Sequence, residues 1–225
     1  MATKYIAHRG FANLQTENTI AAFQFAAKSN AFGIETDVHV TRDGKFVVFH
    51  DDNTIRLCGQ EYIIEDTDFD CLRGLTITTP VAQIPTLDEY ITICKSGNKH
   101  AVIELKNPMT RDQIAKLIKE IENKNYLFAT TFISFDMNNC LTIREILPHQ
   151  PVQFITITFE PVVLKQIADK KIDLDIEWTC LSRDRIKQCH DLGIKVNCWT
   201  LNDDKIAKHF EKCGIDYITS NNLGV

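Results

Sequence analysis

Short apolar runs of strand length alternate with longer helical patterns along most of the chain. The runs that predict strands cover residues 4–8, 32–38, 101–106, 130–135, 152–156, 172–178, 195–200 and 216–220. Apolar positions at helical spacing predict helices over 18–31, 87–96, 111–124, 137–147, 161–170, 182–193 and 203–214. Eight strands alternating with helices favour an α/β protein with a (β/α)8 (TIM) barrel. A doubly wound open sheet is the alternative.

Residues 41–86 interrupt this alternation. Asp43-Gly44 predicts a tight turn into a strand over 45–50, which would extend the second strand as a hairpin. The stretch 51–86 holds Gly, Pro and Thr without a long periodic run, and it is either a linker or a small insertion over one barrel mouth. We favour the insertion. A chain of 225 residues suits one barrel, so we expect a single domain, 1–225, that contains it.

Charged side chains lie within two strands that are otherwise apolar. Glu35 and Asp37 are two positions apart, as are Glu104 and Lys106, so each pair shares one face of its strand. Near the carboxyl end of a barrel strand that face meets the mouth, where barrel active sites lie. Three neighbouring carboxylates would repel one another unless a cation lay between them. Oxygen ligands suit Mg²⁺, Ca²⁺ or Mn²⁺, so Glu35, Asp37 and Glu104 are candidate ligands of one divalent cation.

Two histidines and two cations accompany the carboxylates at strand ends. Arg9 and Lys106 carry the positive charge that binds a phosphate. His8 and His50 have the side chains best suited to act as general base and general acid near neutral pH. A metal ion, cations and two histidines are the groups needed for phosphoester cleavage.

Each of these features also has a simpler interpretation. A histidine at a strand end is often a hydrogen-bonded structural residue, and a Glu-x-Asp pair on a strand often faces solvent or forms a salt bridge. Glu104 and Lys106 alone would also fit an ion pair in the core. Their occurrence together at the ends of the early strands favours the catalytic interpretation.

Composition excludes several classes of partner. The net charge is −5 and the pI is about 5.8, so the chain has no basic surplus for nucleic acid or anionic membranes. No apolar run is long enough for a membrane span, and the start of the sequence shows no signal-peptide pattern, which predicts a cytoplasmic protein. The eight cysteines form no C-x-x-C pair, so we expect free thiols rather than disulfides or zinc. Monomer and homodimer both remain open.

Several short motifs occur together in one order along the chain. They are AHRG (7–10), ENT (17–19), ETDVHVTRDGKFVVFHD (35–51), IPTLDE (84–89), IELK (103–106), SF (134–135) and CWTLN (198–202). In this order they resemble the glycerophosphodiester phosphodiesterase family. The likeness extends over nearly the whole chain, and the combination is far more specific than any single motif.

The resemblance implies a TIM barrel with a small insertion and a hydrolase that releases sn-glycerol 3-phosphate and an alcohol. It implies His8 and His50 as the acid/base pair, and a divalent cation held by Glu35, Asp37 and Glu104. Arg9 and Lys106 would bind phosphate. The resemblance also implies a substrate contact for Phe135 and for Trp199, although Trp199 would equally suit packing at the barrel rim.

The chain departs from the family's pattern at two places. Thr16 stands where a proline is usual, and Ser220, Asn221 and Asn222 replace the end of a Thr-Asp-x-Pro sequence. We expect the second change to alter a contact at the rim or the chain end rather than catalysis. The remaining histidines have no role in the pattern. His39 is expected to be structural, and His100, His149, His190 and His209 are expected on the surface in helices or loops.

Other functions compete with the glycerophosphodiesterase interpretation. A phospholipase C- or D-like enzyme acting on phospholipids or lysophospholipids would use the same residues. A non-catalytic barrel that binds phosphodiesters is a second alternative, although degenerate proteins tend to lose one of these groups. A barrel isomerase or aldolase with Lys106 as a Schiff base is disfavoured, because neighbouring carboxylates raise the pKa of a lysine.

Overall fold

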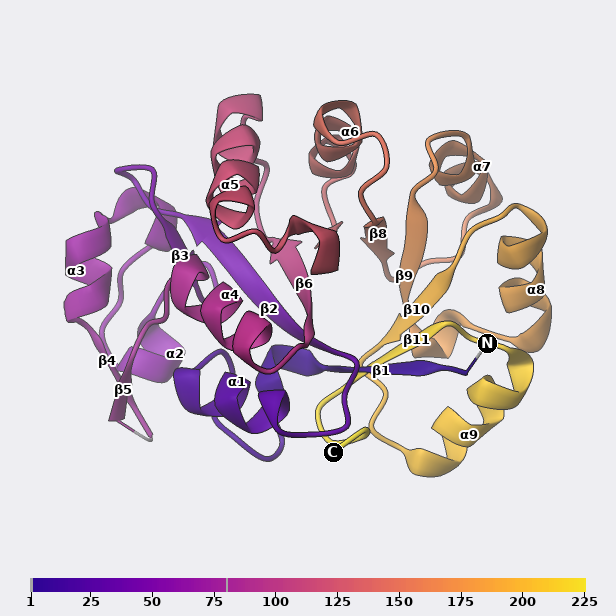
Figure 1. Ribbon diagram of the computed structural model, residues 1–225, viewed down its shortest axis with the longest axis horizontal. Helices are drawn as coiled ribbons and strands as arrows, with labels where there is room; N and C mark the ends of the chain where they lie inside the picture. The colour runs from indigo at the N-terminus through magenta and orange to yellow at the C-terminus, as the bar shows by residue number, and fades with distance from the viewer. Residues whose placement is uncertain (1, 80) are drawn as a thin grey trace.

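Eight parallel strands close into a barrel at the centre of the molecule (Figure 1). The computed structural model describes residues 2–79 and 81–225. The first strand pairs with both the second and the last, since Ala7 lies opposite Ile34 and Lys4 opposite Tyr217. In order around the barrel the strands are β1 (Lys4–Ala7), β2 (Gly33–Val40), β6 (His100–Leu105), β7 (Thr130–Ser134), β8 (Val152–Thr156), β9 (Asp173–Glu177), β10 (Val196–Trp199) and β11 (Tyr217–Ser220). The predicted barrel is confirmed and the open sheet is excluded.

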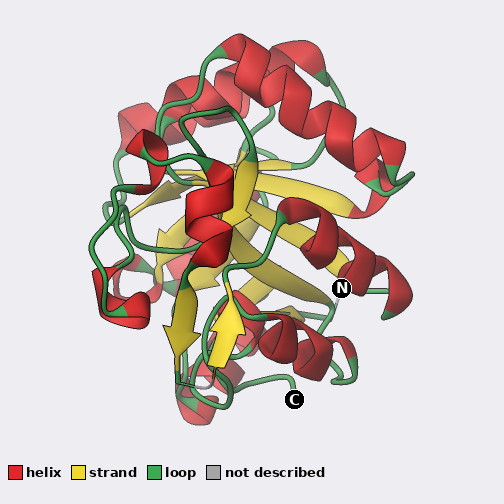
Figure 2. Cartoon of the chain, turned by 90° about the vertical axis from the view of Figure 1, so that its left-hand side faces the viewer, coloured by secondary structure: helices red, strands yellow, loops and turns green. Residues whose placement is uncertain are grey.

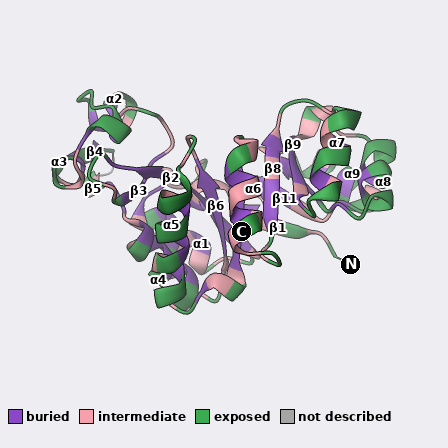
Figure 3. Ribbon diagram, turned by 90° about the horizontal axis from the view of Figure 1, so that it is seen from above, coloured by how far each residue is buried: buried purple, intermediate pink, exposed green. Residues whose placement is uncertain are grey.

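Amphipathic helices surround the barrel, with their exposed faces outward and the buried strands inside (Figure 3). They are α1 (Ile20–Ala27), α4 (Leu87–Ser96), α5 (Arg111–Asn123), α6 (Met137–Ile146), α7 (Pro161–Asp169), α8 (Arg183–Asp191) and α9 (Asp204–Cys213). Their starts follow from capping chemistry: Thr19 caps α1, and Thr86 and Thr110 form capping boxes with Glu89 and Gln113. Helix α1 ends four residues before the predicted boundary at residue 31. Short 3₁₀ turns complete the barrel connections at η1 (His8–Gly10), η3 (Leu127–Ala129) and η4 (Trp178–Cys180).

The interior of the barrel has an apolar layer and a polar network. Ile6, Val102, Ile133 and Ile155 pack together inside the strands. A hydrogen-bonded network occupies β8, β10 and β11, where the Asn197 side-chain amide donates to Gln153 and Thr219. Eight strands enclose just enough space for side chains and one small ligand. These two groups of residues therefore fill the barrel and leave its carboxyl end for a site.

The hairpin predicted after the second strand is present. Strand β3 (Phe46–Val48) pairs antiparallel with β2, with Val48 opposite Val38. The segment 51–86 follows and lies at one side of the barrel (Figures 1 and 2). It contains α2 (Ile55–Cys58), η2 (Ile64–Asp66), α3 (Phe69–Gly74), β4 (Thr76–Thr78) and β5 (Val81–Gln83).

This segment has an apolar cluster of its own. Ile64, Leu72 and Ile77 are buried and pack with Val47 and Phe49 from the end of the hairpin. Burial of such side chains contributes roughly 1.5–3 kcal/mol each. The segment is therefore fixed against the hairpin rather than free like a linker.

Among the described helices, none has both the length and the apolar character needed to cross a lipid bilayer.

Candidate active site

The turn after β1 brings its polar groups to the mouth of the barrel. Arg9, Gly10 and Phe11 all have positive φ angles, of 49°, 77° and 70°. A Cβ atom at Gly10 would lie 2.7 Å from Ala22, so only glycine fits between the turn and α1. The turn directs the backbone N–H of Arg9 at Oε2 of Glu35, at 2.9 Å. Residues other than glycine rarely adopt positive φ angles, and residues strained in this way concentrate at functional sites.

The His8 imidazole is held between the turn and the end of the chain. Its Nδ1 lies 2.7 Å from Oδ1 of Asn221, and its Nε2 lies 3.9 Å from Oε2 of Glu35. An amide oxygen can only accept, so the proton lies on Nδ1 and Nε2 is free to take a proton. Burial, followed by the charge of Arg9, lowers the pKa of His8 to about 4, which keeps the ring neutral. The segment that departs from the family's pattern therefore contacts His8, whereas the sequence predicted a changed contact at the rim or the chain end.

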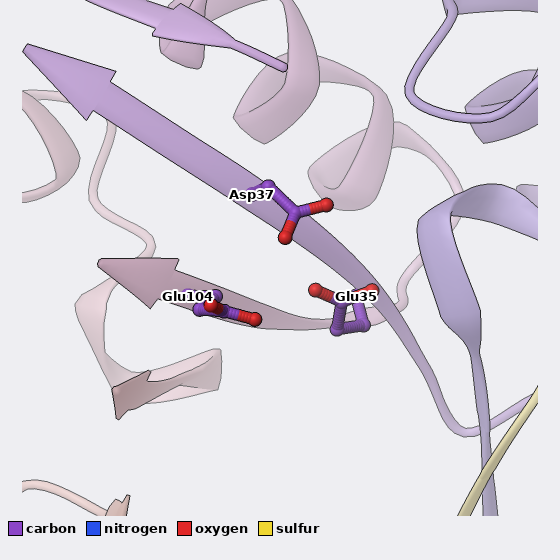
Figure 4. Close-up of side chains that lie close together, drawn as sticks. All are labelled: Glu35, Asp37 and Glu104. Atoms are coloured by element: carbon purple, nitrogen blue, oxygen red, sulfur yellow. The ribbon is translucent and has the colours of Figure 1, made fainter. Parts of the chain in front are cut away.

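Three carboxylates meet where β2 and β6 lie side by side. Glu35 and Asp37 project from β2 toward Glu104 on β6 (Figure 4), and one oxygen from each lies within 4.8 Å of the others. All three side chains are buried. The predicted shared face of β2 and the predicted proximity of Glu104 are thus both present.

The electrostatics of this group fit a cation. Burial, followed by the charge of Asp37, raises the pKa of Glu35 well above its usual value and that of Glu104 to about 7. Burial alone would also raise the pKa of Asp37, but Arg9 and Lys106 hold it at about 2. Oδ1 of Asp37 and Oε1 of Glu104 are buried and contact the ammonium of Lys106. Buried carboxylate oxygens are the ligands that Mg²⁺ and Ca²⁺ take.

Arg9 and Lys106 lie on the two sides of Asp37. Nε of Arg9 is 3.2 Å from Oδ2, and Nζ of Lys106 is 3.4 Å from Oδ1 and 2.9 Å from Oε1 of Glu104. Burial lowers the pKa of Lys106, but the charges of Asp37 and Glu104 outweigh it and raise the pKa. The ammonium therefore stays charged, which suits phosphate binding and argues against a Schiff-base lysine.

Asn18 supports the carboxylates from the turn that enters α1, a role beyond the helix cap that the sequence suggested for Asn18 or Thr19. Its side-chain amide donates to Oδ2 of Asp37 at 2.7 Å, and its Oδ1 accepts from Thr36 at 2.9 Å. Both contacts are buried. The motif ENT contained the signal, because Asn18 stands between Glu17 and Thr19, which caps α1.

His50 lies across the mouth and is linked to a charged network. Its Nδ1 lies 2.7 Å from Oδ1 of Asp51, and Asp51 accepts two hydrogen bonds from Arg56 on α2. Arg56 also donates to Glu17, which accepts from Arg9 at 2.9 Å. Burial lowers the pKa of His50. The network connects the two halves of the site through the segment 51–86, and no sequence pattern indicated it.

A cavity of about 240 Å³ opens beside these groups. Its polar side has His8, Arg9, His50 and Lys106 together with two of the carboxylates. The rest of its lining mixes apolar and polar side chains, and it includes the rings of Phe135 and Trp199. Their rings pack edge to face, with centroids 5.6 Å apart and an angle of 85°. Phe135 is 45% exposed, so it can contact a ligand that enters the cavity.

One of the remaining histidines lies where the sequence did not predict it. His100 opens strand β6, stacks on Phe32 and has Nε2 2.8 Å from Oγ1 of Thr131, so its assignment to a surface helix or loop was wrong. His39 is fully buried on β2, with Nε2 3.5 Å from the carbonyl oxygen of His50. Its structural role stays a prediction.

Comparison with known proteins decides the family. The model of the glycerophosphoryl diester phosphodiesterase family matches residues 8–225. The chain belongs to this family. The resemblance predicted from the motifs is thereby confirmed, together with the assignment to the phosphodiesterases.

Individual relatives agree with this assignment. A glycerophosphodiester phosphodiesterase of Bacillus altitudinis is 28% identical over 228 residues, which cover 96% of this chain and 93% of the relative. The crystal structure of a glycerophosphodiester phosphodiesterase from Parabacteroides distasonis matches with a TM-score of 0.86 and 29% identity, over 98% and 93% of the two chains. A phosphodiesterase of Oleispira antarctica, solved with the product sn-glycerol 3-phosphate, has the same fold, with a TM-score of 0.89, 22% identity and coverage of 98% and 93%.

Proposed function

We propose that this protein hydrolyses glycerophosphodiesters to sn-glycerol 3-phosphate and an alcohol, with a divalent cation bound by Glu35, Asp37 and Glu104. The observation that carries the proposal is one cavity lined by two imidazoles, two cationic side chains and two members of a cluster of three buried carboxylates. The family match supports it, as does the relative of the same fold that was solved with sn-glycerol 3-phosphate bound.

The substrate phosphate binds between the two cationic side chains and the cluster of three carboxylates. Arg9 and Lys106 are already charged and fixed by Asp37, so they need no rearrangement to bind an anion. When bound, Mg²⁺, Ca²⁺ or Mn²⁺ supplies charge that stabilises the phosphoryl oxygens in the transition state. Phe135 and Trp199 contact the substrate at the rim.

The two histidines move the protons. His8 is neutral and its free Nε2 faces the cavity, so it accepts the proton of the glycerol 2-hydroxyl as this oxygen attacks phosphorus. His50 is nearer the solvent and hydrogen-bonded to the Asp51 carboxylate, so it donates a proton to the leaving alcohol. Water then opens the resulting cyclic phosphate.

Direct attack by water would use the same side chains, and isotope labelling separates the two routes. A cyclic glycerophosphate should accumulate transiently in single-turnover reactions and then take up one ¹⁸O atom from labelled water. Uptake of ¹⁸O with no cyclic species at any time would contradict the cyclic route, but not the hydrolysis itself.

The first test is release of sn-glycerol 3-phosphate from glycerophosphocholine by the purified protein. We expect activity to be lost in EDTA, restored by Mg²⁺ or Ca²⁺, and lost in His8→Ala and Glu35→Ala. The exposed His190→Ala variant is the matched control and should keep full activity. Release that persists in both site variants would contradict these assignments.

Failure with every head group would contradict the proposed substrate class. Lysophosphatidylcholine is then the next substrate to test, because a phospholipase D-like enzyme would use the same residues. A folded protein that binds phosphodiesters and cleaves none would be a non-catalytic barrel.

A further inference from the structure

A fourth buried carboxyl group lines the cavity and has no part in the proposed mechanism. Asp175 lies in the middle of β9, between Ile155 on β8 and Asn197 on β10, and is 2% exposed. It is one of the residues that line the 240 Å³ cavity. Aspartate is almost never this buried unless something pairs with it.

The Asp175 carboxyl has an unused hydrogen-bonding atom. Among the described residues, 2–79 and 81–225, its Oδ1 has no hydrogen-bond partner. The polar side chains below it are occupied, because the Asn197 amide donates to Gln153 at 3.3 Å and to Thr219 at 3.0 Å. Ile133 and Ile155 in the cavity lining offer no donor, and the Thr219 hydroxyl donates to Asn197. Trp199 also lines the cavity, and its buried Nε1 likewise has no partner among the described residues. An unpaired buried oxygen destabilises the fold, so its retention points to a ligand.

Asp175 is separate from the carboxylates that would bind the cation. In the order β2, β6, β7, β8 and β9, its strand is four places from β2 in a barrel of eight, so the two strands face each other across the interior. The three carboxylates lie on β2 and β6. A substrate whose phosphate lies at Arg9 and Lys106 therefore has Asp175 opposite it, across the cavity.

We propose that Asp175 recognises the glycerol end of the substrate by a hydrogen bond to its terminal hydroxyl group. This inference rests on the proposed glycerophosphodiesterase function and specifies how that site selects its substrate. A hydroxyl donates and accepts, so it satisfies the Oδ1 atom, which has no hydrogen-bond partner among the described residues. The glycerol then lies deep in the barrel, and the alcohol end leaves past the exposed ring of Phe135.

The test compares two diesters that differ in one hydroxyl group. Glycerophosphocholine has the terminal hydroxyl, and propane-1,2-diol 1-phosphocholine lacks it but keeps the 2-hydroxyl. We expect the protein to prefer glycerophosphocholine in kcat/KM by about 10- to 100-fold, since a site that hydrogen-bonds a substrate hydroxyl rejects the analogue without it.

Two variants remove the Asp175 carboxyl. In Asp175→Ala and in Asp175→Val, which fills more of the space, the preference should fall to near unity through loss of activity on glycerophosphocholine alone. The control is Asp173→Asn, which changes a carboxyl on the same strand two positions away and should keep the preference. Equal losses on both diesters, or an unchanged preference, would overturn the proposal.

Calorimetry separates this proposal from the wider function. Titration with sn-glycerol 3-phosphate and with inorganic phosphate, both in Mg²⁺, needs no turnover. We expect Asp175→Val to weaken binding of sn-glycerol 3-phosphate about 10-fold or more and to leave phosphate binding unchanged. If neither diester is cleaved, the proposed function fails, but calorimetry still tests the role of Asp175. Equal affinity of the unchanged protein and Asp175→Val for sn-glycerol 3-phosphate would overturn that role.

Discussion

The Nδ1 atom of His50 lies 2.7 Å from Oδ1 of Asp51, the next residue in the chain. A carboxylate in this position fixes the ring orientation and stabilises the imidazolium form. The pairing makes His50 suitable to protonate a leaving alcohol even though burial lowers its pKa.

Replacing Asp51 should therefore reduce kcat. We expect Asp51→Asn to lower kcat for glycerophosphocholine by about 10- to 100-fold, since an amide orients the ring but does not stabilise its charge. Steady-state kinetics measure the effect. Asp52→Asn changes the adjacent carboxyl and should leave kcat within about two-fold; a similar loss in both variants would contradict the specific role of Asp51.

Asn221 holds the proton on Nδ1 of His8. We expect Asn221→Ala to lower kcat about 10-fold or more with little change in KM, because the ring loses its fixed orientation while the phosphate contacts remain. The neighbouring Asn222→Ala serves as the control. An increase in KM with kcat unchanged would instead indicate that Asn221 contacts the substrate.

Arg56 and Arg73 both lie in the segment 51–86, but they should have different effects. The Arg56 guanidinium donates hydrogen bonds to Glu17 and Asp51 beside the site. The Arg73 guanidinium donates to Glu89 and to the carbonyl oxygen of Ile84, away from the site. We expect Arg56→Met to reduce kcat/KM about 10-fold with little change in Tm, because its ion pairs are partly exposed.

Arg73→Met should give the opposite result, with a lower Tm and nearly normal kcat/KM. Thermal melts and kinetics on the same preparations distinguish the two residues. A lower Tm with unchanged kcat/KM in Arg56→Met would contradict a link between this segment and the proposed catalytic groups.

Removing the cation should destabilise the protein. Without it, burial and mutual repulsion of Glu35, Asp37 and Glu104 act against the fold, so Mg²⁺ or Ca²⁺ should raise Tm by several degrees over EDTA. In Glu104→Gln we expect a higher Tm in EDTA and almost no response to the metal. A full response to metal in this variant would place the cation elsewhere.

Acid should weaken the fold through His100. Burial lowers the pKa of His100 from 6.5 to about 4, so the unfolded chain binds a proton more readily than the folded protein. The neutral His100 ring makes its full contribution to the free energy of unfolding above pH 6.5. As the pH falls toward 4, this free energy decreases by on the order of 3 kcal/mol. His100→Gln should flatten this part of the urea-unfolding profile. The exposed His209→Gln should not, and identical profiles for both would contradict the assignment.

The sequence predicted the parts of the site that depend on strand periodicity. Glu35 and Asp37 share a face because they are two positions apart, and Glu104 joins them because β6 is the neighbour of β2. The strand and helix order followed from the alternation of apolar patterns. His100 was misplaced because the strand was started one residue late, at Ala101.

The contacts that the sequence could not show are those between distant segments. Arg56 meets Glu17 across 39 positions, and no local pattern encodes which loop will lie beside which. Asp175 had a usable signal, since it shares a face with Glu177, but a lone carboxyl between apolar residues indicates neither a cavity nor an unpaired oxygen.

The contact between His8 and Asn221 has a consequence for biosynthesis. The two residues are 213 positions apart, so at roughly 5–20 residues per second a ribosome adds the second about 10 to 40 seconds after the first. Until β11 has paired with β1, a nascent chain has His8, the proposed general base, without the Asn221 side chain that orients it. The enzyme would thus emerge from the ribosome inactive, and its activity would begin only when the barrel closes.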